Sequence, residues 1–385
     1  MDINFKTYQR CTRCVMDTTD PDIHFDSTGE CSHCHDFDNY YTKGWKQGKE
    51  GETELSQLVK QIKENSRNKP YDCLLGLSGG VDSSYLAYIA KNLELRVLAI
   101  HVDAGWNSEL AVQNIEQICS KLSIDLITEV VDWNEMKDLQ RAFLKSRVLN
   151  LDIPQDHAYF AILNKCAVKY KIKYVLSGFN ISSECILPPA WRGYLALDSV
   201  HLKAIHNKYG SIKLKRFPLM HFLASLIYYP YIRKIKTIFP LNYLSYNKEE
   251  SAIFLQKELS WVPYGGKHHE SRFTKFYQSY YLFKKFGIDE RKAHYSSLIL
   301  SGQLSRSEAI AKLSIDPAGD ALVQKRDKAY ICQKLGFTTD ELEEILDKEN
   351  GRHDDYKSSQ AFVIKMLPHL VKFKNILRKL GLVKY

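Results

Sequence analysis

Short apolar runs alternate with amphipathic segments along residues 54–177. Four runs rich in Leu, Val, Ile and Tyr predict strands over 71–77, 95–102, 124–131 and 174–177. Apolar residues that recur at helical spacing predict helices over 54–65, 81–92, 110–122 and 156–171. Strands that alternate with helices of this length favour an α/β fold with a doubly wound, mainly parallel sheet. Ligands of such sheets bind at the carboxyl ends of the strands.

The pattern differs on either side of that region. Residues 1–50 are expected to form a small module that is Cys-rich up to about residue 40, and the polar stretch 43–52 across its boundary is expected to be a linker. Residues 51–200 carry the strand–helix alternation, whereas 201–385 show no clear further strand and predict a mainly helical substrate or partner domain. The apolar stretch 217–231 contains a histidine and two prolines. It predicts a buried helix or a docking surface, with peripheral membrane contact as the weaker alternative.

Composition narrows the class of protein. The chain has 385 residues and a formal net charge of +9, which favours an anionic partner: a nucleotide, a sugar nucleotide, RNA or a membrane surface. The first residues lack the apolar core of a signal peptide, and no uncharged apolar run is long enough to span a bilayer. We therefore expect a cytoplasmic protein without a transmembrane segment. In a reducing cytoplasm, the nine cysteines are expected to be metal ligands or buried thiols rather than disulfides.

The most informative segment is a glycine-rich loop, SGGVDS, between the first predicted strand and the helix that follows it. Two glycines allow a tight turn with uncovered N–H groups, and the helix N-terminus adds partial positive charge, so the loop suits a phosphate chain. Asp82 would repel phosphates unless Mg²⁺ lay between them, which gives it an indirect catalytic role through the metal. The predicted ATP-binding residues of this loop are Ser78, Gly79, Gly80, Val81, Asp82 and Ser83.

The loop is not the P-loop of kinases and GTPases, whose lysine is absent, nor is it G-x-G-x-x-G. The S-G-G-x-D-S string resembles the signature of the PP-loop ATP pyrophosphatases, an adenine nucleotide alpha hydrolase-like group that includes GMP, NAD and asparagine synthetases and tRNA thiolation enzymes. That resemblance implies pyrophosphate binding in the loop and transfer of AMP to a substrate oxygen. It also implies ATP contacts from Val102, after the second strand, and from Ser177 and Gly178, after the fourth. Ordinary helix capping is the alternative for these loops.

Two C-x-x-C pairs, Cys11 with Cys14 and Cys31 with Cys34, are separated by 16 residues. This spacing is typical of a tetrahedral Zn²⁺ site, in which each pair lies on a tight turn and aims two thiolates at one ion. A segment this small needs such a metal to stay folded, so we predict a structural zinc-ribbon module. Redox chemistry and an iron–sulfur cluster are the alternatives.

A charged segment, WVPYGGKHHESR, spans residues 261–272. Lys267 and Arg272 are candidates to clamp phosphates of ATP or of a second substrate. Glu270 or a neighbouring histidine could take a proton from the incoming nucleophile. The alternative is a solvated helix start, since charge clusters usually lie on the surface.

The motifs are more specific together than separately. The C-T-R-C-V-M-D…C-x-x-C module, L-S-G-G-V-D-S-S-Y, D-I-P-Q-D-H-A (152–158) and G-G-K-H-H-E-S-R-F-T (265–274) resemble the N-acetyl sugar amidotransferases of lipopolysaccharide O-antigen and surface-sugar biosynthesis. The resemblance implies conversion of an acetamido group on a nucleotide-activated sugar into an acetamidino group. Adenylation would turn the N-acetyl oxygen into a good leaving group, which ammonia would replace with release of AMP and pyrophosphate.

This chemistry needs ammonia, and the sequence shows neither an N-terminal cysteine nor a G-x-C-x-G elbow of a glutaminase. The resemblance therefore implies a separate partner like the glutaminase subunit of imidazole glycerol phosphate synthase, with its barrel-shaped, cyclase-like companion as a further candidate. No nucleic acid partner is expected. The main rival is a tRNA thiolation enzyme, for which only Cys185 could carry a persulfide. A second rival is a scaffold that merely binds nucleotide.

Overall fold

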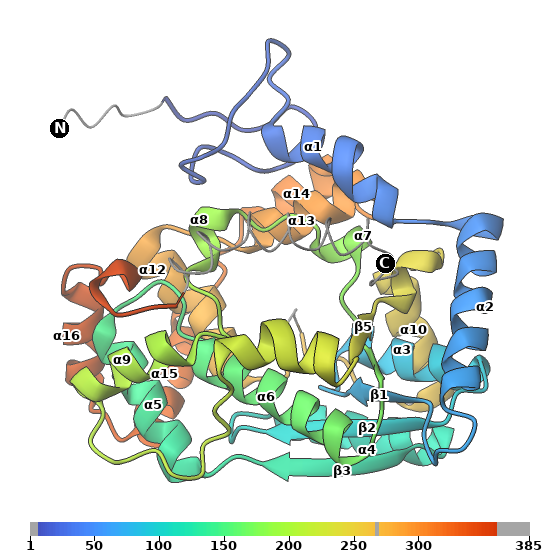
Figure 1. Ribbon diagram of the computed structural model, residues 1–385. Coiled ribbons are helices and arrows are strands. Elements are labelled where there is room, and N and C mark those ends of the chain that lie inside the picture. The colour runs from blue at the N-terminus through green and yellow to red at the C-terminus, as the bar shows by residue number, and fades with distance from the viewer. Residues whose placement is uncertain (1–6, 266–268, 360–385) are drawn as a thin grey trace, which may run out of the picture.

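The computed structural model describes residues 7–265 and 269–359 and contains a five-stranded parallel sheet, which lies in the lower part of Figure 1. The strands are β1 Cys73–Gly76, β2 Val97–Asp103, β3 Asp125–Val130, β4 Tyr174–Leu176 and β5 Lys236–Ile238. Their order in the sheet is β3-β2-β1-β4-β5, and every neighbouring pair is parallel. The order reverses between β1 and β4, and a crevice for ligands opens at such a switch point.

Helices cover both faces of the sheet. They are α2 Gly48–Asn65, α3 Val81–Asn92, α4 Glu109–Leu122, α5 Trp133–Ser146, α6 Ile153–Lys169 and α10 Lys248–Leu259. Successive strand residues point to opposite faces, so Leu74 of β1 packs into a core with α5 and α6, whereas Leu75 packs into a second core with α2, α3, α4 and α10. The predicted doubly wound α/β fold is therefore confirmed.

The polar stretch 43–52 is not the linker that its composition predicts. Residues Thr42–Gly44 form a 3₁₀ turn, η2, and α2 begins at Gly48. Gly51 lies so close to the backbone of Tyr243 that a Cβ at this position would overlap the Tyr243 carbonyl oxygen. The glycine in this charged stretch therefore serves close packing of a helix rather than flexibility.

Two features beyond residue 200 differ from the expectation. The strand β5 has only three residues, two of them exposed, and it joins the sheet through its backbone pairing with β4, so it leaves no apolar run in the sequence. The buried helix predicted as one alternative for 217–231 is wrong as well. Residues Ala224–Ile232 form a π-helix, η3, and none of its residues is buried.

The remainder of the C-terminal region is mainly helical, as expected. None of the helices in the described part of the chain is both long enough and apolar enough to cross a bilayer. The helices and turns not yet named are α1 Ser32–Asp36, η1 Phe37–Tyr41, α7 Ile181–Glu184, α8 Pro189–Arg192, α9 Ser199–Tyr209, η4 Pro240–Tyr243, α11 Arg272–Phe276, η5 Tyr277–Tyr281, α12 Leu282–Phe286, α13 Arg291–Leu300, α14 Arg306–Leu313, α15 Ala321–Leu335, α16 Thr339–Asp347 and η6 His353–Asp355.

The N-terminal Cys-rich module lies against α13 and α14 of the C-terminal region (Figure 1). The guanidinium of Arg306 donates hydrogen bonds to the carbonyl oxygens of Cys14 and Cys11, at 3.0 and 2.8 Å. The ammonium of Lys292 lies 2.6 Å from the carboxylate of Asp17, whose side chain is fully buried. The module is therefore docked onto the C-terminal region through polar contacts that exclude water.

The ion pair between Asp17 and Lys292 makes the stability of the folded protein depend on pH. Burial by itself raises the pKa of Asp17, but hydrogen bonds from Lys292 and Thr19 outweigh burial and leave this pKa below its ordinary value. The stabilisation that this carboxylate contributes is therefore present at neutral pH, and it is lost as the pH falls through the lowered pKa of the folded state.

We predict that Lys292→Met lowers the free energy of unfolding by about 3–5 kcal/mol, because it leaves the Asp17 carboxylate buried without its cation. Urea denaturation at neutral pH measures the change. The matched control is Lys328→Met, which removes a lysine from an ion pair with the half-exposed Glu343 and should cost at most about 1 kcal/mol. Equal losses in the two variants would contradict the docking role of Lys292.

Candidate functional site

A cleft of about 580 Å³ opens at the carboxyl ends of β1 and β4, where the strand order reverses. This volume is in the range of nucleotide and cofactor sites. Both the sheet and the C-terminal region contribute to its walls. The described residues that line it are Gly76, Ser78, Gly80, Val81, Asp82, Ser83, Asp156, Tyr159, Ser177, Gly178, Phe179, Glu184, Lys248, Trp261, Pro263, Tyr264, Gly265 and Glu270.

The glycine-rich loop forms the floor of the cleft between β1 and α3. Gly80 is the N-cap residue of α3 and offers no side chain to the first turn, so the helix N-terminus faces the cleft without a capping group. The hydroxyl oxygens of Ser78 and Ser83 lie 3.2 Å apart beside it. Backbone N–H groups at a helix N-terminus and two hydroxyls are suited to hold phosphate oxygens, as the sequence predicted.

Gly79 gives the loop its tight turn. Its φ of +84° is in the left-handed region, and a Cβ on it would lie 2.5 Å from the carbonyl oxygen of Ala111 in α4. The carbonyl oxygen of Gly79 accepts a hydrogen bond of 2.8 Å from the indole N–H of Trp261. Gly79 therefore shapes the loop from behind and is not among the described residues that line the cleft.

The carboxylate of Asp82 is held by three residues from other parts of the chain. Tyr246 donates its hydroxyl to Oδ1 at 2.6 Å, and the side-chain amide of Asn180 donates to the same oxygen at 3.0 Å. The ammonium of Lys248 lies 2.7 Å from Oδ2. These contacts tie the first turn of α3 to the segment after β4 and to the start of α10.

Lys248 is the cation that the sequence analysis missed. Burial by itself lowers the pKa of Lys248, but the carboxylates of Asp82 and Glu184 outweigh burial and raise it, so the ammonium is charged at neutral pH. Lys248 is also the first residue of α10, where the helix dipole disfavours a positive charge. Asn247 is the N-cap of this helix and accepts hydrogen bonds from the N–H groups of Glu249 and Glu250. Such a cap predicts the start of a helix in the sequence, but not the role of the lysine that follows it.

The loop after β4 approaches the first turn of α3 closely. A Cβ on Gly178 would lie 3.1 Å from the carbonyl carbon of Asp82, so glycine is needed for this approach. Ser177 and Gly178 line the cleft, as predicted, together with Phe179. Val102 lies within β2, paired with Glu129, and is not among the described residues that line the cleft. The ATP contact expected at Val102 stays a prediction.

The described residues of the charged segment 261–272 that line the cleft are Trp261, Pro263, Tyr264, Gly265 and Glu270. The carbonyl oxygen of Glu270 accepts a hydrogen bond from the N–H of Ser108 at 2.8 Å, and the Glu270 side chain lines the cleft. The guanidinium of Arg272 instead lies 3.3 Å from the ring centroid of Tyr330 and 3.8 Å from the carboxylate of Asp327. The charge of Arg272 thus packs against α15 and is not in the described wall of the cleft, and its role as a catalytic phosphate clamp stays a prediction. Lys267 lies outside the described residues.

Several residues of the cleft wall carried no recognisable signal. Asp156 and Tyr159 lie on α6, within and directly after the segment 152–158 that resembled the amidotransferases, but their side chains were not singled out. Burial and the nearby carboxylates of Glu270 and Asp82 raise the pKa of Tyr264, so its phenol is neutral. The charged side chains in the described wall of the cleft are four carboxylates, Asp82, Asp156, Glu184 and Glu270, and the ammonium of Lys248.

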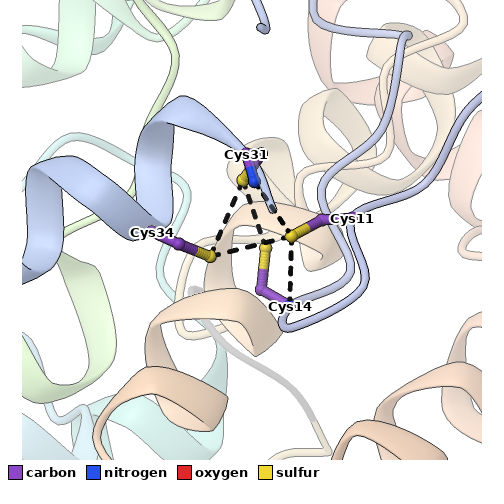
Figure 2. A group of neighbouring side chains, drawn as sticks. All are labelled: Cys11, Cys14, Cys31 and Cys34. Carbon is purple, nitrogen blue, oxygen red and sulfur yellow. Dashed lines mark hydrogen bonds between the residues drawn. The ribbon is translucent and has the colours of Figure 1, made fainter. Parts of the chain in front are cut away.

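The four cysteines of the N-terminal module converge on one point, as Figure 2 shows. All four are buried, and their sulfur atoms lie within 4.8 Å of one another. The sulfur–sulfur distances are 3.7 Å for Cys11 and Cys34, 3.6 Å for Cys14 and Cys31, and 3.7 Å for Cys31 and Cys34. A tetrahedron with metal–sulfur bonds of about 2.3 Å has edges of about 3.8 Å, so the cluster is shaped to hold one metal ion.

Comparisons with known families agree with this arrangement. The PP-loop domain family matches residues 49–168, which include the glycine-rich loop. The family described as "LPS biosynthesis protein WbpG-like, C-terminal domain" matches residues 270–370, which begin at the cleft residue Glu270. The chain is a WbpG-like PP-loop protein. PP-loop proteins are ATP-using enzymes, and the glycine-rich loop of this WbpG-like protein lines the cleft.

Curated relatives match only part of the chain. A tRNA(Ile)-lysidine synthase from Chlamydia felis is 24% identical over 175 residues, or 44% of this chain and 49% of the relative. A GMP synthase from Chlamydia caviae is 40% identical over 85 residues, or 22% of this chain and 16% of the relative. The WbpG-like protein therefore spans half or less of the length of these relatives. The solved U34-tRNA thiolase NcsA from Methanococcus maripaludis is 16% identical, with 78% of this chain and 90% of that chain covered, and its TM-score of 0.31 carries no argument about function.

We predict that Gly79→Ala weakens binding of a non-hydrolysable ATP analogue by roughly tenfold or more, because the new Cβ would displace the loop from α4. Calorimetric titration of the folded protein measures the affinity. The matched control is Gly302→Ala, whose φ is +75° with nothing within 4 Å of the added Cβ. It should cost about 1–2 kcal/mol of stability and leave the ATP affinity unchanged. Unchanged affinity in Gly79→Ala would show that the loop does not bind the nucleotide.

Proposed function

We propose that this WbpG-like protein is an ATP-dependent amidotransferase. It adenylates the N-acetyl oxygen of a nucleotide-activated sugar and replaces that oxygen with ammonia, which gives an acetamidino group, AMP and pyrophosphate. The product would serve lipopolysaccharide O-antigen or related surface-sugar biosynthesis. The rival is a tRNA-modifying enzyme, such as a tRNA thiolation enzyme, because relatives of the chain include a tRNA(Ile)-lysidine synthase and a tRNA-specific 2-thiouridylase.

The single observation that carries the proposal is the meeting of two family regions in one cleft. The PP-loop region supplies Ser78, Ser83 and Asp82, and the WbpG-like C-terminal region begins at Glu270, whose side chain faces the same space. The two regions are joined by backbone hydrogen bonds, from Ser108 to Glu270 and from Arg272 to Trp106. A surface-sugar region at the ATP site favours a sugar substrate over RNA.

The thiolation alternative has little support in the cleft. Thiolation would need a reactive cysteine that reaches the substrate. Cys185 is only 3% exposed and packs in the hydrophobic core, and no cysteine is among the described residues that line the cleft. The chemistry of the described wall is that of carboxylates, hydroxyls and one ammonium.

Each of these groups has a role in the proposed reaction. The loop and Lys248 would hold the phosphates and neutralise the charge that develops as pyrophosphate leaves. Glu270, whose carboxylate lies beside Gly80 of the loop, would accept a proton from ammonia as it attacks the adenylated carbon. Tyr246 and Asn180 orient the Asp82 carboxylate through the hydrogen bonds described above.

Mg²⁺ fits the donor set of the cleft. Asp82, Asp156, Glu184 and Glu270 are hard oxygen ligands, and Mg²⁺ is usually bound through one or two carboxylates together with substrate phosphates. Among the described residues, the four cysteines are the only group of His, Cys, Asp or Glu side chains whose ligand atoms lie close enough together to hold a metal ion. The carboxylates of the cleft do not form such a cluster by themselves. We propose that Asp82 holds Mg²⁺, which would supply charge neutralisation for the phosphate chain.

Zinc is the proposed ion of the cysteine cluster. Four buried thiolates at tetrahedral distances suit Zn²⁺, and a closed shell without an open position suits a structural role. The ammonia would come from a separate glutaminase, like the glutaminase subunit of imidazole glycerol phosphate synthase, with or without its cyclase-like companion. These partners are proposed from the reaction, which consumes ammonia that the chain has no recognised means of producing.

The test of the function is pyrophosphate release from ATP by the purified protein. We expect release only when an ammonium salt and one of a panel of UDP-linked N-acetyl sugars are both present, with a product in which NH replaces oxygen by mass spectrometry. Release that depends on bulk tRNA instead would establish the tRNA-modifying alternative. If neither the sugar nucleotides nor bulk tRNA support pyrophosphate release, the amidotransferase proposal is wrong, and the chain is a PP-loop protein that acts on another substrate.

The role of Lys248 is tested in the same assay. We predict that Lys248→Met lowers the rate of pyrophosphate release by about 10²–10³-fold, as loss of one charge-stabilising donor does. Lys257→Met is the matched control, because Lys257 lies on the same helix with 81% of its side chain exposed, and it should keep full activity. The double variant Asp82→Asn with Lys248→Met removes both charges, so it should recover stability without recovering activity. Wild-type rates in Lys248→Met would exclude a catalytic role.

We predict one equivalent of zinc per chain, measured by elemental analysis of the purified protein. Cys34→Ser should lower the zinc content and the melting temperature together, because metal binding and folding of the module are coupled. Cys73→Ser is the matched control, since Cys73 is buried in β1 away from the cluster and its substitution should leave the zinc content unchanged. Iron and inorganic sulfide in place of zinc would establish the iron–sulfur alternative.

A further inference from the structure

One stretch of the chain accounts for its net charge. Residues 199–248 contain nine Lys and Arg residues and no Asp or Glu, which equals the formal net charge of +9 for the whole chain. In the remaining sequence, the numbers of basic and acidic residues are equal. One of the nine is Lys248, which is used inside the cleft, and the exposed ones lie on the stretch that runs from α9 past η3 to β5.

The same stretch exposes its apolar side chains. Phe222 and Ile235 are each 8% exposed and fasten the segment at both ends, but no residue from 223 to 234 is buried. Within it, Leu223, Tyr231 and Ile232 are 60%, 54% and 64% exposed. In Figure 1 this segment is the yellow-green helix that leads into β5, the edge strand of the sheet. We call residues 223–236 the apolar–basic segment.

The segment is fixed in place rather than loose. The N–H of Met220 donates a hydrogen bond of 2.9 Å to the ring nitrogen of the fully buried His157, just before the segment begins. At its other end, β5 pairs with β4. The protein therefore holds these apolar side chains in water at a defined site, where an unoccupied surface of this kind is unfavourable.

Basic side chains lie at the carboxyl end of the exposed apolar residues. Arg233, Lys234 and Lys236 are all exposed, and no ion pair in the described part of the chain involves any of them. The guanidinium of Arg233 lies 5.9 Å from the ring centroid of Tyr228. Aliphatic and tyrosine side chains bordered by Lys and Arg, without acidic neighbours in sequence, match the chemistry of a membrane interface.

We propose that the apolar–basic segment docks the protein onto an anionic lipid bilayer. Leu223, Ile227, Tyr231 and Ile232 enter the headgroup boundary, and the three basic residues contact the phosphates of anionic lipids. A nucleic acid would use the charges, but it would gain little from exposed Leu and Ile. The charge complementarity and the aliphatic content together therefore favour lipid.

Docking at this segment would bring the cleft to the membrane surface. Phe239, which directly follows β5, packs against Phe179 with ring centroids 5.6 Å apart, and Phe179 lines the cleft. The docked surface and the mouth of the ATP site are therefore adjacent. The inference does not depend on which substrate the enzyme uses.

The experiment is co-sedimentation of the full-length protein with phosphatidylcholine vesicles that contain or lack phosphatidylglycerol, at low and physiological salt. We expect binding only to the anionic vesicles, weakened by salt. The triple variant Ile227→Ser, Tyr231→Ser and Ile232→Ser should weaken vesicle binding by roughly tenfold or more. The triple variant Arg233→Gln, Lys234→Gln and Lys236→Gln should weaken it by about fivefold per charge removed.

The matched control variants replace exposed apolar or basic residues outside the apolar–basic segment. Ile315→Ser with Leu322→Ser removes apolar side chains that are 65% and 75% exposed. The triple variant Lys60→Gln, Lys91→Gln and Lys257→Gln removes three exposed charges from α2, α3 and α10, on the opposite face of the sheet. Both controls should bind vesicles as the wild type does.

Three outcomes would overturn the proposal. The first is absence of binding to anionic vesicles. The second is vesicle binding that neither segment variant weakens, which would assign it to another surface, such as the chain beyond residue 359. The third is binding that only the charge variant weakens, together with equal loss of binding to bulk tRNA, which would mark the segment as a polyanion or RNA surface. Pyrophosphate release without vesicles serves as the check that every variant is folded, and it should be unchanged.

Discussion

The carboxylate of Asp82 and the ammonium of Lys248 form the ion pair on which the functional part of the molecule depends. Each side chain is 19% exposed, so neither charge is stable there without the other. Tyr246 and Asn180 complete the hydrogen bonding of the same carboxylate. Since these residues come from separate segments, the pair fixes the phosphate-binding loop against the segment after β4 and the start of α10. A charged pair at the wall of the cleft thus also organises the fold around it.

The same contacts continue outward to the cysteine module. Asn180 caps α7, and the hydroxyl of Ser301, just after α13, donates a hydrogen bond of 2.7 Å to the carbonyl oxygen of Ser182 in α7. On its other side, α13 carries Lys292, which pairs with Asp17 of the module. The module is therefore connected to Asp82 through two packed layers of structure. A metal in that cluster would stabilise the wall of the cleft from a distance, without touching the substrate.

The sequence predicted those parts whose physical cause is local. The turn at Gly79 and Gly80, the helix at Val81–Asn92 and the two C-x-x-C pairs each follow from a few neighbouring residues. Lys248 could not be found in this way, because its function comes from a partner 166 residues away in the sequence. Arg272 lies near Glu270 in the sequence and was predicted to act with it, whereas its guanidinium packs on Tyr330 from α15, a contact between residues 58 positions apart that no local pattern shows. Short edge strands such as β5 escape prediction because backbone pairing, not burial, defines them.

The distribution of charge changes how the basic composition is understood. A net charge of +9 favours an anionic partner, but the described wall of the cleft carries Asp82, Asp156, Glu184 and Glu270 against the single ammonium of Lys248. ATP and the proposed nucleotide sugar would both add negative charge to this wall, which the proposed Mg²⁺ would offset. The excess positive charge lies instead on residues 199–248, where most of it faces solvent. The net charge of the chain therefore describes its outer surface, whereas the described wall of the cleft has the opposite charge balance.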